Sequence, residues 1–222
     1  MLRNWIKSNR GFLVLLLCFG IFRTAVADWN PIPSGSMRPT LLEGDVVFVN
    51  RLAYDVKLPL TDVVLLPLGE PQRGDVVTFS SPQDGTRLIK RIAAVPGDRV
   101  EMRNEVLYIN GQAAQYDAPE VVQEAVGVGA TVQATRWTER LGGHERRVQW
   151  LHGVPARSTF DAIDVPAGQY LMLGDNRDDS VDSRYIGLVP RHLLIGQARR
   201  VLVSADILGH WAPRLQRMGL PL

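Results

Sequence analysis

Cysteine, histidine and lysine are all scarce in this sequence of 222 residues. The single cysteine, Cys18, excludes an intramolecular disulfide, so cysteine content does not identify a cellular compartment. The four histidines lack His-Glu-x-x-His spacing and a cysteine partner, which argues against a zinc site. A Ser–His–Asp triad stays open, because the fold and not the spacing assembles a triad. The net charge of +2 is too small to indicate a nucleic-acid-binding protein.

Lysine is scarce relative to arginine, because only three of the 25 basic residues are lysine: Lys7, Lys57 and Lys90. Unlike arginine, a lysine in an apolar context can lose its proton near neutral pH. In a strand, Lys90 would share a face with Leu88 and Ile92, and burial on that face would lower its pKa toward the range of a general base. The alternative is a surface lysine whose amine reaches water.

A candidate nucleophile lies in the segment Ile32-Pro-Ser-Gly-Ser-Met-Arg-Pro-Thr-Leu41. Gly35 gives the backbone freedom beside Ser36, while Pro33 and Pro39 restrict both flanks. A nucleophilic hydroxyl needs such a presentation, with an N–H group nearby to receive an oxyanion. The alternative is a polar loop with no chemical role.

The N-terminal apolar run is short: residues 11–22 carry no charge, and the run reaches Ala27 only if Arg23 is tolerated. A membrane-spanning helix needs about 20 apolar residues, with a lower limit near 17. Basic residues precede the run, and it ends in Ala25-Val26-Ala27, so a secretory signal peptide is the competing interpretation. We favour a retained, single-pass anchor over residues 11–28, with residues 1–10 in the cytoplasm and the body (29–222) outside it. The reason is that Ser36 follows Ala27 by only nine residues, so an anchor would hold it at the membrane surface.

The body is predicted to be mainly β. Short β-branched runs bounded by glycine, proline and asparagine predict strands at 45–50, 75–80, 88–95, 99–103, 106–109, 169–173 and 197–204. Residues 112–165 show few periodic runs, so we interpret them as an inserted subdomain. Residues 173–187 combine four aspartates with two arginines, which favours a buried ion-pair network that makes a site rigid. A solvated turn and a calcium loop are the alternatives, although the two arginines oppose cation binding.

Four segments together resemble the motif set of bacterial type I signal peptidases, in the same order. They are Ile32-Pro-Ser-Gly-Ser-Met, Arg73-Gly-Asp-Val-Val, Ile89-Lys-Arg-x-x-x-x-Pro-Gly-Asp98 and Gly174-Asp-Asn-Arg-Asp-x-Ser-x-Asp-Ser-Arg-Tyr185. The resemblance spans about residues 31–200 and implies a mainly β catalytic body with a hydrophobic surface near the membrane. It departs from the best-known Gram-negative type, which has two N-terminal membrane segments, in having one. Residues 112–165 also lack the cysteine pair that some relatives have.

The resemblance also implies roles for individual residues. Ser36 would be the acylating nucleophile and Lys90 its general base, and the Ser34 hydroxyl with the Ser36 N–H would form the oxyanion hole. Ser180 would orient the lysine amine, and Asp182 with Arg184 would form a supporting ion pair. The candidates for lining the substrate pockets are Ile32, Met37, Leu88 and Ile89.

The implied substrates are exported pre-proteins with Ala-x-Ala-type signal peptides, cut after small residues at −3 and −1. The implied location is the bacterial inner membrane in contact with lipid, and no metal or organic cofactor is needed. Ala25-Val26-Ala27 itself resembles such a substrate, so we also expect slow self-cleavage after Ala27. The alternatives are a dedicated maturation peptidase of the same fold, for instance for a conjugative pilin, and a non-catalytic, membrane-tethered binding domain. A self-cleaving repressor with the same dyad is disfavoured by the membrane segment.

Overall fold

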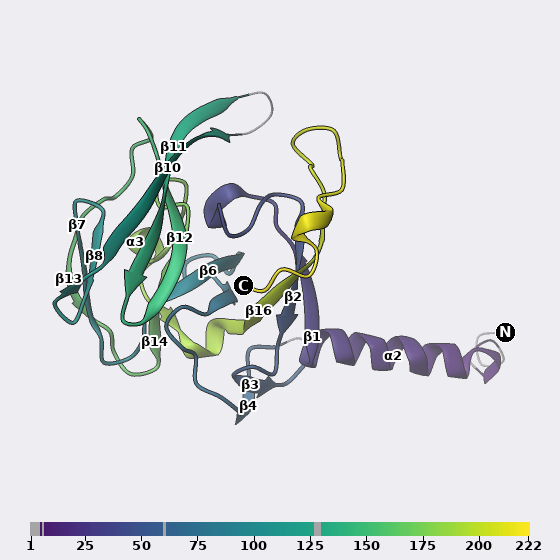
Figure 1. Ribbon diagram of the computed structural model, residues 1–222. Helices are drawn as coiled ribbons and strands as arrows, with labels where there is room; N and C mark the ends of the chain where they lie inside the picture. Colours follow the sequence, from purple (N-terminus) through teal and green to yellow (C-terminus); the bar gives the residue numbers. More distant parts are fainter. Residues whose placement is uncertain (1–4, 6, 60, 127–129) are drawn as a thin grey trace.

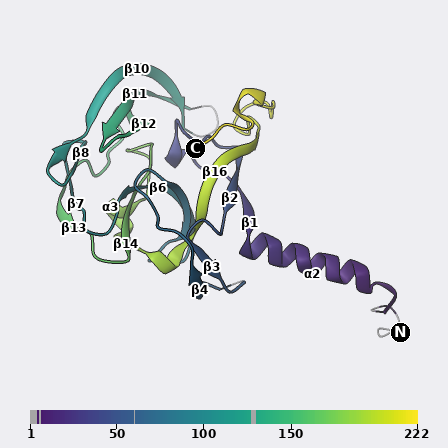
Figure 2. The ribbon, with the colours of Figure 1, turned by 60° about the horizontal axis from the view of Figure 1, so that its bottom comes forward.

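The computed structural model describes residues 5, 7–59, 61–126 and 130–222. The body consists mainly of antiparallel sheets, and one long helix projects from it (Figure 1). The prediction of a mainly β body is therefore confirmed. From a second direction (Figure 2), the helix again leaves on the side away from strands β7, β8 and β10 to β13.

The largest sheet has seven strands, and every neighbouring pair in it is antiparallel. In spatial order the strands are β1 (Ala27–Pro31), β2 (Asp45–Asn50), β16 (Leu194–Ser204), β5 (Val76–Ser80), β6 (Arg87–Ala94), β14 (Gln169–Leu173) and β15 (Val189–Pro190). Alternation in β2 buries Val47 and Val49 and leaves the residues between them half-buried. This pattern is typical of a strand with one face on a core.

Three smaller sheets complete the body. One has the order β13 (Phe160–Asp164), β7 (Arg99–Arg103), β8 (Val106–Ile109) and β9 (Gln112–Ala113). The second holds β10 (Gln115–Ala125), β11 (Thr131–Leu141) and β12 (His144–Leu151), and the third pairs β3 (Asp55–Lys57) with β4 (Val64–Pro67). Short helical turns lie at η1 (Gly35–Met37), α3 (Ser183–Ile186), η2 (Arg191–Leu193) and η3 (Leu215–Arg217).

The predicted strands are all present, three of them with shifted ends at β5, β6 and β16. The hairpin turns at Asn104-Glu105 and Asn110-Gly111 adopt the positive φ angles that tight hairpins need. Residues 112–165 differ from the expectation, because most of them form the β10–β12 sheet with two strands of 11 residues each. Their first and last strands, β9 and β13, pair with β8 and β7 outside the segment.

The N-terminal helix, α2 (Arg10–Ala25), has 16 residues and no buried side chain. Among the helices of the described residues, none has both the length and the apolar character required to span a bilayer. The helix ends two residues before β1, so the segment predicted as an anchor over 11–28 divides into helix and strand. Arg23 lies over the indole of Trp29 at 4.5 Å and pairs with Asp28 at 3.2 Å, so its side chain turns toward the body.

Candidate active site

Ser36 lies in the short turn η1, which residues 32–34 connect to the end of β1. The turn is closed by the Arg38 N–H, which donates to the Gly35 carbonyl at 3.0 Å. Asn176 holds it from outside: its backbone N–H donates to the Ser36 carbonyl and its side-chain amide donates to the Gly35 carbonyl, both at 3.1 Å. Met37 and Leu41 anchor the turn below, because both are completely buried in a core cluster with Val47. The hydroxyl of Ser36 is therefore carried on a backbone that is fixed on several sides.

Lys90 reaches Ser36 from strand β6, and its amine donates to the Ser36 Oγ at 2.5 Å. The lysine is 3% exposed. Burial lowers its pKa to about 8, although the nearby carboxylates of Asp182, Asp179 and Asp175 act in the opposite direction. The amine is thus partly neutral slightly above neutral pH, and a neutral amine can accept the proton of the hydroxyl it contacts.

Gly174 is packed closely against the Ser180 side chain and the Ser36 backbone. A Cβ atom there would come within 2.2 Å of the Ser180 Oγ and 2.6 Å of the Ser36 carbonyl oxygen. Asp182 binds the Gly174 N–H at 3.0 Å and forms an ion pair with Arg184 at 2.9 Å, as expected for the supporting pair. Within the described residues the buried Ser180 Oγ has no hydrogen-bond partner, so the expected bond to Lys90 is not present in this geometry. Ser180 nevertheless lines the same cavity as Lys90.

Buried ion pairs support the loop that follows β14. Arg91, the neighbour of Lys90, donates to both oxygens of Asp175 at 2.9 and 2.7 Å. Arg177 is fully buried and pairs with Glu139 of β11 at 2.6 Å. Burial acts to raise the pKa of Glu139, but Arg177 and Arg146 outweigh it and hold that pKa at about 2. The predicted ion-pair network in residues 173–187 is thus confirmed, and it extends to β6 and β11.

Two neighbouring cavities open beside the dyad. The first, of about 400 Å³, is lined by Ser34, Ser36, Leu88, Lys90, Asp178, Asp179, Ser180, Val181 and Tyr185. The second, of about 260 Å³, is lined by Asn30, Pro31, Ile32, Pro33, Thr78, Arg87, Leu88 and Ile89. Leu88 belongs to both, so the cavities adjoin. Of the four predicted pocket residues, Ile32, Leu88 and Ile89 line the second cavity, whereas Met37 lines neither and packs in the core.

Three contributors to the site were not singled out from the sequence. The roles of Asn176 and Gly174 depend on a close approach between η1 and the loop after β14, which are far apart in the chain. Glu139 belongs to the segment interpreted as an insertion, and its only signal was a carboxylate in an otherwise polar strand. The motifs contained Asn176 and Gly174 but gave no physical reason for them.

The family model described as "Signal peptidase, peptidase S26" matches residues 2–203. The chain belongs to this family. Signal peptidase I of Pseudomonas aeruginosa is 36% identical over 211 residues, which cover 90% of this chain and 72% of that protein. Signal peptidase I of Pseudomonas fluorescens is 34% identical over 231 residues, covering 97% and 78%. A crystal structure of a signal peptidase I from Enterococcus faecalis V583 aligns with 59% of this chain and 97% of that one, at 30% identity and a TM-score of 0.34.

As a member of the signal peptidase family, the chain is a serine endopeptidase. Serine endopeptidases act by acyl transfer to a serine hydroxyl. A serine hydroxyl in contact with a buried amine, as found here, is an arrangement suited to that reaction.

Proposed function

We propose that this chain is a membrane-bound endopeptidase that removes N-terminal signal peptides from exported pre-proteins through a Ser36–Lys90 dyad. The observation that carries the proposal is the 2.5 Å contact between the Lys90 amine and the Ser36 hydroxyl in a buried setting. The names of the relatives, signal peptidase I, support the substrate class. The lowered pKa of Lys90, about 8, supports its role as the base.

In the acylation step, neutral Lys90 removes the proton of the Ser36 hydroxyl as its oxygen attacks the peptide carbonyl after the −1 residue. The C–N bond then breaks, and the lysine ammonium returns the proton to the leaving amine. The acyl-enzyme holds the signal peptide as an ester on Ser36. Lys90 next activates a water molecule, which hydrolyses the ester and frees the serine.

The negative oxygen of the tetrahedral intermediate needs hydrogen-bond donors. We propose the Ser34 hydroxyl and the Ser36 N–H, supported by Ser34 lining the same cavity as Ser36 and Lys90. Ser180, whose hydroxyl has no partner within the described residues and which lines the same cavity as Lys90, would orient the lysine ammonium. Asp182 and Arg184 would support that region through their buried ion pair.

The two adjoining cavities suit two small side chains. In our proposal the cavity around Ser36 and Leu88 receives the −1 residue, and the more apolar cavity with Ile32 and Ile89 receives the −3 residue. Alternation places the −1 and −3 side chains of an extended substrate on one face, about 7 Å apart, which matches a pair of neighbouring pockets. Met37 would then act as a support for the turn, not as a pocket wall.

Membrane attachment is part of the proposal. Helix α2 carries exposed leucine, phenylalanine and isoleucine side chains, and the β3–β4 hairpin exposes a second group of large apolar residues: Leu58, Val63, Val64, Leu65, Leu66 and Leu68. Exposed apolar patches of this kind are typical of membrane or protein contacts. We propose that α2 with its preceding segment anchors the chain in the inner membrane, with the catalytic body on the extracytoplasmic side. Protease protection of the body in sealed inverted vesicles would support this topology, and protection of the N-terminal segment would contradict it.

The decisive experiment is cleavage of a purified pre-protein with an Ala-x-Ala site, in detergent, by the wild type and the variants Ser36→Ala and Lys90→Ala. We expect correct processing by the wild type and none by either variant. Processing by Lys90→Ala at the wild-type rate would refute the dyad. A folded wild type that leaves this substrate intact would move the proposal to a dedicated peptidase with another substrate, or to a non-catalytic tether.

A further inference from the structure

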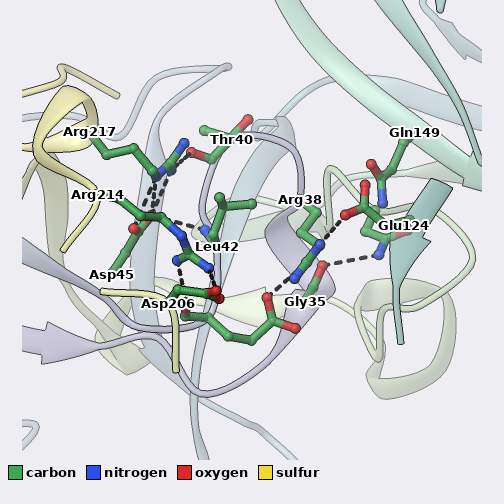
Figure 3. A network of polar contacts seen from close by, with 12 residues as sticks. Gly35, Arg38, Thr40, Leu42, Asp45, Glu124, Gln149, Asp206, Arg214 and Arg217 are labelled. Atoms are coloured by element: carbon green, nitrogen blue, oxygen red, sulfur yellow. Dashed lines mark hydrogen bonds and ion pairs between the residues drawn. The ribbon is translucent and has the colours of Figure 1, made fainter. Parts of the chain in front are cut away.

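The loop that follows the nucleophile, residues 38–45, is held from two sides by charged side chains (Figure 3). One side is the β10–β12 sheet and the other is the C-terminal tail, residues 205–222. In Figure 1 the purple segment after β1 indeed lies between the β10–β11 hairpin and the yellow tail. We call residues 38–45 the nucleophile loop.

On the first side, Arg38 joins the nucleophile loop to strand β10. Its guanidinium forms ion pairs with Glu124 of β10 and, at 2.7 Å, with Glu43 of the loop itself. Glu124 also pairs with Arg136 of β11 at 2.7 Å. Arg38, Glu43 and Glu124 are each less than 10% exposed. Charges so deeply buried are stabilised only while their partners remain in place.

On the second side, the tail binds the far end of the loop. Arg217 donates to the Asp45 carboxylate at 2.6 Å and to the Thr40 carbonyl at 2.9 Å. Arg214 donates to the Glu43 carbonyl at 2.9 Å. The tail therefore fixes the part of the loop that leads into β2, while Arg38 fixes the part next to Ser36.

The contact with the β10–β12 sheet bears more directly on Ser36 than the contact with the tail does, because of the position of Arg38. Arg38 is two residues after Ser36, and its own N–H closes the turn that presents the hydroxyl. The side chain that bonds to Glu124 and the backbone N–H that closes the turn belong to the same residue. This covalent link gives a displaced guanidinium a direct route to the backbone that carries Ser36.

We propose that Glu124 is a positioning residue for the Ser36 nucleophile, acting through Arg38, so that the β10–β12 sheet is needed to align the dyad. This inference rests on the proposed Ser36–Lys90 function. It gives a role to the part of the chain that the sequence presented as an insertion. Glu124 lines neither of the two cavities described above, so we expect it to act on turnover and not on substrate affinity.

The test compares Glu124→Gln with Glu120→Gln in the full-length protein. Glu120 lies on the same strand and also pairs with an arginine, Arg147, but both side chains of that pair are 50% exposed. The control therefore removes the same charge without touching the nucleophile loop. We expect Glu124→Gln to lower kcat about 10- to 100-fold with KM within twofold, because misplacement of a reacting group by about 1 Å can cost roughly 100-fold. Glu120→Gln should match the wild type.

A second measurement does not depend on activity. The Arg38 N–H and the Asn176 N–H both report on the Ser36 turn, and their hydrogen exchange can be followed by mass spectrometry or NMR. We expect at least tenfold faster exchange of both amides in Glu124→Gln and unchanged exchange in Glu120→Gln. If Glu124→Gln does not fold, Arg38→Lys replaces it, since lysine keeps the charge but lacks the forked geometry that joins two carboxylates. We expect the same loss of kcat from Arg38→Lys.

The outcomes are distinct. Faster exchange together with a lower kcat supports the proposal. An unchanged kcat overturns it, whether or not exchange becomes faster, because the contact is then only structural. A raised KM with unchanged kcat also overturns it in favour of a binding role. If the wild type itself cleaves no pre-protein, the proposed function has failed, and unchanged exchange in Glu124→Gln would overturn the positioning link independently.

Discussion

At the scale of single residues, the burial of Lys90 supplies the base of the proposed mechanism and carries a cost in stability. The amine is 3% exposed and its pKa is about 8. Only the neutral amine can act as the base, so kcat/KM for a signal-peptide substrate should rise with pH up to about 8 and level off above it. The measurement is a pH–rate profile from pH 6 to 10. We expect Lys90→Arg to be inactive throughout, because arginine stays protonated, and a profile that falls over this range would contradict the assignment.

The same burial predicts a pH-dependent stability. Between pH 8 and the unfolded value of 10.5, the unfolded chain binds more protons at Lys90 than the folded chain does, so the wild type gains stability as the pH rises. Lys90→Met lacks this dependence. We therefore compare the free energy of unfolding of Lys90→Met minus that of the wild type at different pH values. This difference should become more negative by on the order of 3 kcal/mol between a pH below 8 and a pH above 10.5. Urea denaturation of both proteins at several pH values measures the difference, and a constant difference would disprove the prediction.

Gly174 gives a steric prediction. A methyl group there would collide with the Ser180 side chain and with the Ser36 carbonyl oxygen. We expect Gly174→Ala to lose most activity and about 1–3 kcal/mol of stability, as overpacked sites do. The double variant Gly174→Ala with Ser180→Gly removes only the first collision. Full recovery of activity in that double variant would show that the contact with Ser36 is unimportant.

At this scale the sequence is most informative for the residues that we propose to carry the chemistry. Ser36, Lys90, Asp182 and Arg184 stand in motifs with a chemical meaning. Gly174 and Asn176 are harder to recognise, because both contact the Ser36 turn, which lies about 140 residues earlier in the chain. Met37 illustrates the same limit of the sequence, which shows an apolar residue beside Ser36 but not that its side chain packs in the core and lines neither of the two cavities.

At the scale of elements, the pair Glu139–Arg177 joins the β10–β12 sheet to the loop after β14. Glu139→Gln leaves Arg177 buried with a weaker partner, so the free energy of unfolding at pH 7 should fall by about 3–5 kcal/mol. The pKa of Glu139 is lowered to about 2 from 4.5, so its contribution is present above pH 4.5 and is lost as the pH falls toward 2. The difference between variant and wild type should shrink over that window.

Glu145→Gln serves as the control for the Glu139→Gln variant. Its partner is Arg140, and their side chains are 60% and 49% exposed. An exposed pair contributes about 0–1 kcal/mol, so the control should unfold almost as the wild type does. Equal losses from Glu139→Gln and Glu145→Gln in urea denaturation would contradict the importance of burial.

Strands facing a core on one side were predictable from alternation, as in β2, whereas β10 and β11 were not. Most residues of β10 are exposed, and its charged side chains pair across strands, so the apolar periodicity that marks a strand is weak. Glu120 pairs with Arg147 of β12, on the far side of β11, and Glu124 pairs with Arg136 of the neighbouring β11. Such a sheet is specified by its cross-strand partners, which a pattern of apolar residues does not reveal.

At the scale of the whole molecule, the structure revises the expectation of self-cleavage after Ala27. The Ala27–Asp28 bond lies in β1, where both residues are buried and paired with Asn50 and Val49 of β2. A protease needs an extended, unpaired substrate segment, so β1 would have to leave the sheet first. We expect the purified protein to keep its full-length mass during long incubation at pH 8. A fragment beginning at Asp28 that is absent from Ser36→Ala would restore the original expectation.

The joint between α2 and β1 has a consequence for how substrates are selected. Val26 alone separates helix from strand, its N–H bonds back to Phe22 and its carbonyl accepts the Arg51 N–H, while Arg23 and Phe19 contact Trp29. With α2 held in the bilayer as proposed, such a joint leaves the body little freedom to tilt or rise. Ser36 would then lie at a fixed height above the bilayer. The enzyme would cleave only peptide bonds that reach this height, and it would leave an acceptable sequence at another depth uncleaved.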